Sequence, residues 1–213
     1  MNSRRAKAST KRAMSQPEGN TGVPSHGRAT ADAALFRDVI RHLASGVTII
    51  TSSLRGEPVG LTATAVCSVS ATPPMLLTSV TVTSRTAAGI AETGSFAVHL
   101  LRHSGRKYAE QFASRGEHFT GLDYSKTKDK RIPVLADVLA WFICEVEHSV
   151  TVADHMIFFG RVLQCELKET RPDPLLYFDR SYRRLAPGAE AGAEKLEPWG
   201  SAEDSGLPGF GWL

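Results

Sequence analysis

The chain has 213 residues, 42% of them hydrophobic, and a formal net charge of +3 at pH 7. This length can bury one sizeable core and is short for two full domains. The charge is uneven, since residues 1–30 carry six Lys or Arg against Glu18 alone and residues 186–213 carry Lys195 against five acids. The middle of the chain is close to neutral, so we expect no nucleic-acid surface.

The two ends of the chain differ in composition from the middle. Residues 1–30 lack apolar periodicity and are rich in Ser, Pro, Gly and charge, which predicts a disordered basic tail. Residues 186–213 form an acidic tail with an aromatic end at Trp199, Phe210 and Trp212. Either this tail docks on the folded domain or a partner subunit, or it frays with incidental aromatics. No stretch is long and apolar enough to span a bilayer, so we expect no membrane partner.

The chain has three cysteines, Cys67, Cys144 and Cys165, which are widely spaced and lie in apolar runs. An odd, scattered set is typical of a reducing compartment, and we expect a cytoplasmic protein with three small core thiols.

The first predicted elements are a helix and a β-hairpin. Residues 31–44 place Leu35, Phe36, Val39 and Leu43 on one helical stripe, so this helix is expected to pack one face on the domain. Residues 47–52 are β-branched and predict a strand. The turn at residues 55–58 leads into a second strand that runs through Leu61, which predicts a hairpin.

Strands and short helices continue along the chain without regular βαβ alternation. The predicted strands are residues 75–80, 96–101, 140–150 and 155–167, and the predicted helices are residues 84–92, ended by Gly94, and 105–114, capped by Ser104. Residues 123–131 are predicted to form a mobile surface loop. This order favours a barrel over a doubly wound sheet.

One segment, residues 60–70, is small, rich in hydroxyl groups and nearly uncharged. Backbone N–H groups beside small side chains can approach the polar edge of a flat aromatic ligand, which must be hydrogen-bonded when buried. The alternative is an ordinary strand with Thr facing solvent. The candidate cofactor-binding residues in this segment are Thr62, Ala63, Thr64, Ala65, Val66, Ser68 and Val69.

A second segment, Thr83, Ser84, Arg85 and Thr86, opens a predicted helix. Hydroxyl groups, free helix N–H groups and a guanidinium would converge there on one anion, so we predict a phosphate site. The alternative is a plain N-cap beside a solvated arginine.

Five ordered strings between Leu35 and Leu185 carry a family resemblance: LFRDVIRHLASGVTIIT, GLTATAVCSVSATPPMLL, SFAVHLL, DHMIFFGRV and PLLYFDRSYRRL. In this order and spacing the chain resembles the flavin reductase-like family. The resemblance implies a mainly β domain at residues 31–185 with flanking helices, an antiparallel FMN-binding split β-barrel of Greek-key type. It also implies a homodimer.

The same resemblance implies further site residues. His155 falls where the family commonly has Gly-Asp-His, a motif associated with the nicotinamide nucleotide, although Ala153 replaces the glycine. Tyr182 and Arg183 would border the nicotinamide pocket, with the alternative of a terminal strand that has a solvated basic edge. Phe112 is a further candidate for the cofactor site.

The implied activity is that of an NAD(P)H:flavin oxidoreductase. Hydride would pass from NADH or NADPH to FMN or FAD, and the reduced flavin would go to a separate monooxygenase. The residues do not choose between the two flavins or between the two nucleotides. Two other possibilities stay open: a flavin-binding electron carrier or sensor without turnover, and a split-barrel protein that binds haem or another cofactor. Scattered histidines and the absence of familiar metal motifs predict no metal site.

Overall fold

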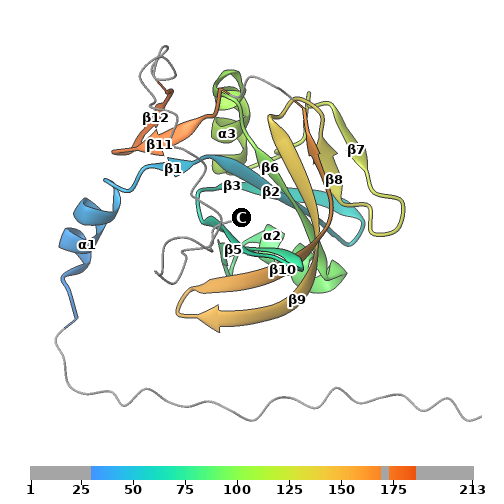
Figure 1. The fold of residues 1–213 in the computed structure, drawn as a ribbon, viewed down its shortest axis with the longest axis horizontal. Helices are drawn as coiled ribbons and strands as arrows, with labels where there is room; N and C mark the ends of the chain where they lie inside the picture. The colour runs from blue at the N-terminus through green and yellow to red at the C-terminus, as the bar shows by residue number, and fades with distance from the viewer. Residues whose placement is uncertain (1–29, 169–172, 186–213) are drawn as a thin grey trace, which may run out of the picture.

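The computed structural model describes residues 30–168 and 173–185, so the predicted tails at residues 1–30 and 186–213 lie outside the described residues except for Thr30. Antiparallel strands dominate the described part (Figure 1). Its main sheet has seven strands in the order β3-β2-β6-β9-β10-β5-β4. These strands are β2 (Thr48–Leu54), β3 (Glu57–Ala63), β4 (Val66–Ala71), β5 (Pro74–Thr81), β6 (Ser95–Leu100), β9 (Ala140–Val152) and β10 (His155–Leu167).

The remaining elements flank this sheet. They are the helices α1 (Ala33–Ile40), α2 (Arg85–Thr93) and α3 (Arg106–Ala113), the 3-10 turn η1 (His103–Gly105), and the short strands β1 (Ser45–Gly46), β7 (Tyr124–Lys126), β8 (Pro133–Leu135), β11 (Leu176–Phe178) and β12 (Ser181–Arg183). Strand β11 pairs with β1 and β12, and β7 pairs with β8.

The strand order is that of an opened barrel rather than a simple meander. The pairs β2–β3, β4–β5 and β9–β10 are hairpins of consecutive strands, while the pairs β2–β6, β6–β9 and β5–β10 join strands that are not consecutive in the chain. No ladder joins the two edge strands β3 and β4 in the described sheet. The chain itself links these edges, because β3 ends at Ala63 and β4 begins at Val66. The predicted antiparallel, mainly β fold with flanking helices is confirmed.

Strand β2 lies between two hydrophobic cores, and its first six residues are all buried. Ile50 belongs to a core with Phe96, Phe158 and the α2 residue Ile90. Its neighbour Ile49 belongs to a second core, which includes Phe112 of α3. Successive side chains of a strand point to opposite faces, so β2 fixes α2 and α3 on the two sides of one sheet.

The predicted elements of the sheet and of α2 are confirmed to within a few residues. Gly94 ends α2 in the left-handed conformation, with φ of +62°, as its position predicted. The strands β1, β7, β8, β11 and β12 have only two or three residues and are too short for periodicity to reveal. The six-residue strand β4 lies within residues 60–70, where an ordinary strand was the alternative interpretation.

The prediction that the first helix packs on the domain is wrong for the single chain. Helix α1 projects away from the barrel (Figure 1), and none of its residues is buried. Leu35, Phe36 and Val39 are each 58–64% exposed. An amphipathic pattern predicts that a stripe is covered but does not say which surface covers it.

Three smaller expectations also need correction. Ser104 lies inside the 3-10 turn and does not cap α3, whose N-cap residue is Gly105 without a side-chain hydrogen bond. Residues 123–131 are not wholly loop, because β7 pairs there with β8. Only Cys144 is a core thiol, whereas Cys67 and Cys165 are exposed on β4 and β10. Alternate strand residues face outward, so an apolar run does not bury each of its members.

Candidate functional site

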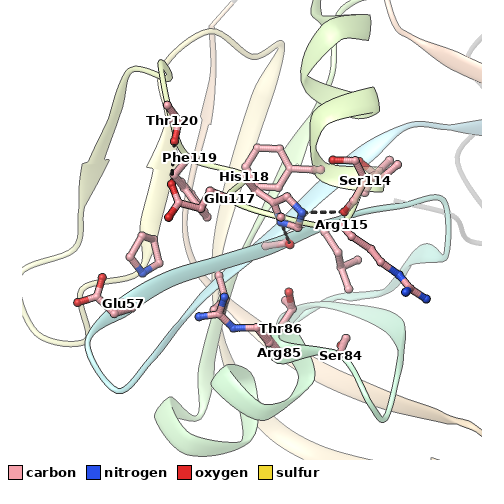
Figure 2. A pocket seen from close by; sticks show the side chains of 18 of the residues that line it. Glu57, Ser84, Arg85, Thr86, Ser114, Arg115, Glu117, His118, Phe119 and Thr120 are labelled. Atoms are coloured by element: carbon pink, nitrogen blue, oxygen red, sulfur yellow. Dashed lines mark hydrogen bonds between the residues drawn. The ribbon is translucent and has the colours of Figure 1, made fainter.

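A cleft of about 1070 Å³ opens between β3, the N-terminus of α2 and the loop that follows α3 (Figure 2). Three segments far apart in sequence line it, with residues 57–62, 81, 83–86 and 112–120. The cleft is at the upper end of the size of small-molecule sites, which are usually 300–1,000 Å³. It contains the predicted residues Thr62, Thr83, Ser84, Arg85, Thr86 and Phe112.

The α2 wall has the chemistry of an anion site. The Ser84 hydroxyl accepts a hydrogen bond from the Ala87 N–H group at 3.0 Å, so Ser84 is an N-cap as well as a cleft residue. The next residue, Arg85, is exposed and has no ion pair or hydrogen bond with the described residues. Thr86 is buried beneath it. A guanidinium without a partner at a helix N-terminus favours a bound anion.

The β3 wall is shaped by a close approach of α3. A Cβ atom on Gly60 would lie 2.6 Å from Cε1 of Phe112, so only glycine lets this ring pack directly on the strand. The Thr62 hydroxyl donates to the carbonyl oxygen of Ala109 at 2.7 Å. This hydrogen bond connects β3 to α3, so the hydroxyl proton of Thr62 is not free to be donated to a ligand.

The third wall is the turn after α3, which sequence reasoning did not assign to the site. Phe112 is buried and meets Phe119 edge to face, with ring centroids 5.1 Å apart. His118 lies between two carbonyl oxygens, with Nδ1 3.0 Å from Gly60 and Nε2 2.8 Å from Ser114. The signal that could have identified this wall was the charged turn Arg115–His118 between two phenylalanines.

A smaller cavity of about 210 Å³ adjoins the cleft and shares Thr62 and Ala113 with it. Its lining residues are Val47, Thr62, Ala63, Thr64, Ala113, Tyr177 and Tyr182. The guanidinium carbon of Arg106 lies 5.4 Å from the ring centroid of Tyr182. Partial burial is the main cause that raises the pKa of the Tyr182 phenol above its usual value. The structure thus places Tyr182 in a cavity next to the cleft.

Five other predicted residues line neither cavity: Ala65, Val66, Ser68, Val69 and Arg183. The predicted segment at residues 62–69 is divided between two strands in the structure, because β3 ends at Ala63 and β4, which begins at Val66, pairs with β5 instead. Its first half reaches the cavities and its second half belongs to the opposite edge strand. Arg183 lies at the end of β12 and is exposed.

His155 also lies outside both cavities, but it lies beside a residue at the edge of the cleft. It begins β10 and is the Cα partner of Thr81, which lines the cleft. Its Nδ1 lies 2.8 Å from Oδ1 of Asp154, and this hydrogen bond lowers the pKa of the Asp154 carboxyl. The Val82 N–H group donates to the carbonyl oxygen of Asp154 at 3.0 Å. The turn that carries His155 is thereby tied to the segment that enters α2.

Ala153 takes the conformation that glycine would favour. Its φ is +52°, in the left-handed region, within the two-residue turn that joins Val152 of β9 to His155 of β10. Alanine therefore holds a backbone conformation that glycine adopts more readily, at the cost of some strain.

Comparisons with known proteins agree with this arrangement. Residues 40–186 match the model of the flavin reductase like domain. A flavin reductase (NADH) of Kitasatospora aureofaciens is 36% identical over 156 residues, which cover 72% of this chain and 82% of that protein. The reductase subunit HsaB of a flavin-dependent monooxygenase from Rhodococcus jostii RHA1 is 32% identical over 87% of this chain and 91% of its own. The crystal structure of nitrilotriacetate monooxygenase component B from Mycobacterium thermoresistibile superposes with a TM-score of 0.69, at 31% identity, over 73% of this chain and 88% of that one.

The open antiparallel barrel and its likeness to solved flavin reductases define a protein of the flavin-binding split-barrel class. The chain belongs to the flavin reductase-like family. The predicted activity class, that of an NAD(P)H-dependent flavin reductase, is confirmed at this level.

None of the helices in the described ranges is long and apolar enough to cross a membrane.

Proposed function

We propose that the 1070 Å³ cleft is the flavin site and that Arg85 binds the flavin phosphate. The observation that carries this proposal is the exposed guanidinium of Arg85, which has no partner among the described residues and lies at the start of α2 in the cleft wall. The N–H groups of Arg85 and Thr86 lie in the first turn, where a helix offers them no acceptor. Thr83 adds a further hydroxyl donor to this wall.

The residues of the cleft fit a phosphorylated aromatic cofactor. A cation and helix N–H groups stand at one wall, and the ring of Phe112 and the backbone of β3 form the others. When bound, the flavin supplies the redox chemistry by accepting hydride from the reduced nicotinamide of NADH or NADPH. The protein contributes binding, orientation and exclusion of water.

His155 and Tyr182 are proposed to position the nicotinamide nucleotide. Tyr182 borders the small cavity beside Thr62, and His155 is tied to the rim at Thr81. Hydride transfer needs orientation of the two rings, and an imidazole can supply it with a hydrogen bond and without moving a proton. Arg183, exposed beside Tyr182, would attract the phosphates of the dinucleotide.

The relatives support a separate monooxygenase as recipient of the reduced flavin. HsaB is named as the reductase subunit of a flavin-dependent monooxygenase, and a similar protein from Thermus thermophilus is named as the reductase component of 4-hydroxyphenylacetate 3-monooxygenase. We propose the same division of labour here. The three free cysteines support a cytoplasmic location.

We also propose a homodimer, which the uncovered stripe of α1 supports. The exposed residues of this helix and the next turn include Leu35, Phe36, Val39 and Leu43, an apolar surface that a second copy would cover. Sedimentation should give a dimer for the wild type and a shift toward monomer for the double variant Phe36→Glu, Val39→Glu. A wild-type monomer would contradict the proposal.

The phosphate site is tested by comparing flavins in equilibrium titrations. Arg85→Ala should weaken binding of FMN and FAD, because a lost charge-assisted hydrogen bond costs about 1.5–3 kcal/mol, or roughly ten-fold or more in Kd. Riboflavin, which has no phosphate, should bind equally to both proteins. The control is Lys128→Ala, an exposed cation in the turn between β7 and β8. Equal weakening for riboflavin would remove Arg85 from the phosphate site.

A further inference from the structure

A second arginine faces the same cleft from another wall. Arg115 follows α3, whereas Arg85 begins α2, and both line the cleft (Figure 2). Both side chains are exposed, and neither has a carboxylate within ion-pair distance among the described residues. Surface arginines without a partner are common, but here two converge on one concave site from segments that are thirty positions apart in sequence.

The turn that carries Arg115 is anchored at both of its ends. On one side, the Ser114 hydroxyl donates to the carbonyl oxygen of Gln111 at 2.7 Å. On the other, the Gln111 side-chain amide donates to the carbonyl oxygens of His118 at 2.8 Å and Thr120 at 3.1 Å. The His118 ring reaches back to Gly60 of β3. These contacts hold the base of the turn against β3, so Arg115 is kept at the cleft.

The charges of the cleft are separated along its length. Figure 2 shows Glu57 and Glu117 toward one end, Arg115 toward the other, and Arg85 between them. The Glu117 carboxylate accepts a hydrogen bond from the Thr120 hydroxyl at 3.3 Å, which directs it to its own turn rather than to Arg115. The cleft therefore offers anions one guanidinium near its middle and a second one toward the end away from Glu57 and Glu117.

We propose that Arg115 binds a second phosphate, so that the cleft takes a dinucleotide whose two phosphate positions are served by different arginines. This inference rests on the proposed flavin site, in which Arg85 binds the first phosphate. FMN has a single phosphate, whereas FAD and the nicotinamide nucleotides contain a diphosphate. The second phosphate thus comes from one of two sources, and Arg115 makes the site selective for the ligand that supplies it.

The experiment compares the wild type with Arg115→Ala and Arg115→Lys, with Lys128→Ala as control for loss of an exposed cation. One arm measures Kd for FMN and for FAD by quenching of flavin fluorescence. The other measures Kd for NAD+ by calorimetry with FMN present. Circular dichroism melts should be unchanged, because the Arg115 side chain is exposed and holds no described contact.

Either of two results is expected. In the first, Arg115→Ala weakens binding of FAD about ten-fold or more and binding of FMN less than two-fold, which identifies FAD as the source of the second phosphate. In the second, Arg115→Ala leaves the binding of both flavins unchanged and weakens binding of NAD+ by a similar factor. A combined loss of FAD and NAD+ binding, with FMN unaffected, also supports a second phosphate position. Arg115→Lys should recover only part of the loss, because an ammonium cannot form the bidentate contact of a guanidinium.

Two results would overturn the inference. Equal weakening of FMN and FAD would mean that Arg115 shares the first phosphate with Arg85, and no change in any affinity would mean that Arg115 is a solvated surface residue. A failure of the proposed flavin site looks different, because FMN and FAD would then bind the wild type no better than riboflavin does.

Discussion

The buried histidine His99 predicts a specific loss of stability in acid. It lies on β6 and is fully buried, with Nδ1 3.0 Å from the carbonyl oxygen of Ile49 on β2. The Leu135 N–H group of β8 donates to its Nε2 at 3.1 Å. Nε2 is therefore an acceptor, and Nδ1 carries the proton of a neutral ring. Desolvation by burial lowers the pKa of His99 to about 4, against a smaller opposing effect of the Ile49 carbonyl.

The sign and size of the effect follow from the two pKa values. The unfolded chain takes up a proton at pKa 6.5 and the folded chain only at about 4, so the contribution of His99 to stability is complete above pH 6.5 and is lost as the pH falls toward 4. One unit of pKa difference corresponds to 1.36 kcal/mol, so the whole loss is about 3 kcal/mol. About 2 kcal/mol of it should occur between pH 7 and pH 4.5.

Urea unfolding at these two pH values, for the wild type and for His99→Asn, isolates this contribution. The other titrating groups are the same in both proteins, so their effects cancel in the comparison. Between pH 7 and pH 4.5 the free energy of unfolding of the wild type should fall by about 2 kcal/mol more than that of His99→Asn. The exposed His148 supplies a control, since His148→Asn should behave like the wild type. An NMR titration of the wild-type His99 ring gives a check without substitution. A ring that becomes protonated near pH 6.5, or equal losses in all three proteins, would refute the reasoning.

Three further substitutions test other parts of the structure. Ala153→Gly should raise the free energy of unfolding by about 0.5–1 kcal/mol in urea titrations, because glycine adopts the observed φ of +52° without strain, and a decrease would contradict this. Thr78→Val should stabilise by about 1 kcal/mol, because the Thr78 hydroxyl is buried without a partner among the described residues, and a lower Tm would show that the hydroxyl is used. His155→Ala should raise KM for NADH roughly ten-fold and leave the Kd for flavin unchanged, and an unaltered rate and KM in stopped-flow reduction would exclude its nucleotide role.

The main strands and the helix α2 could be predicted because their signals are local. Strand β2 is an uninterrupted run of β-branched and hydroxyl residues, and α2 has both a hydroxyl N-cap at Ser84 and a glycine stop at Gly94. These signals depend on backbone conformation within a few residues, which the sequence specifies directly. The position of Arg85 at the start of α2 could be predicted for the same reason.

The exposure of α1 and the third wall of the cleft could not be predicted, because both depend on contacts between distant segments. The apolar stripe of α1 predicts a surface that is buried against something. The helical spacing of its residues is the same whether that partner surface belongs to the same chain or to another one. The turn at Arg115 becomes part of the site only through the packing of Phe112 against Gly60 and the His118 contact to the same strand. These are tertiary contacts between residues more than fifty positions apart in sequence.

The pairing of distant strands also brings together the proposed phosphate site and His155, the residue proposed to position the nucleotide. Thr81 is the last residue of β5, and three residues later Ser84 caps α2. Because β10 pairs antiparallel with β5, its first residue, His155, must lie beside the last residue of β5. A one-residue slip in this register would turn His155 to the other face and detach it from the rim. The Val82 to Asp154 backbone hydrogen bond continues the pairing past the strand end. The position of His155 relative to the start of α2 is thus set by sheet register rather than by a flexible loop.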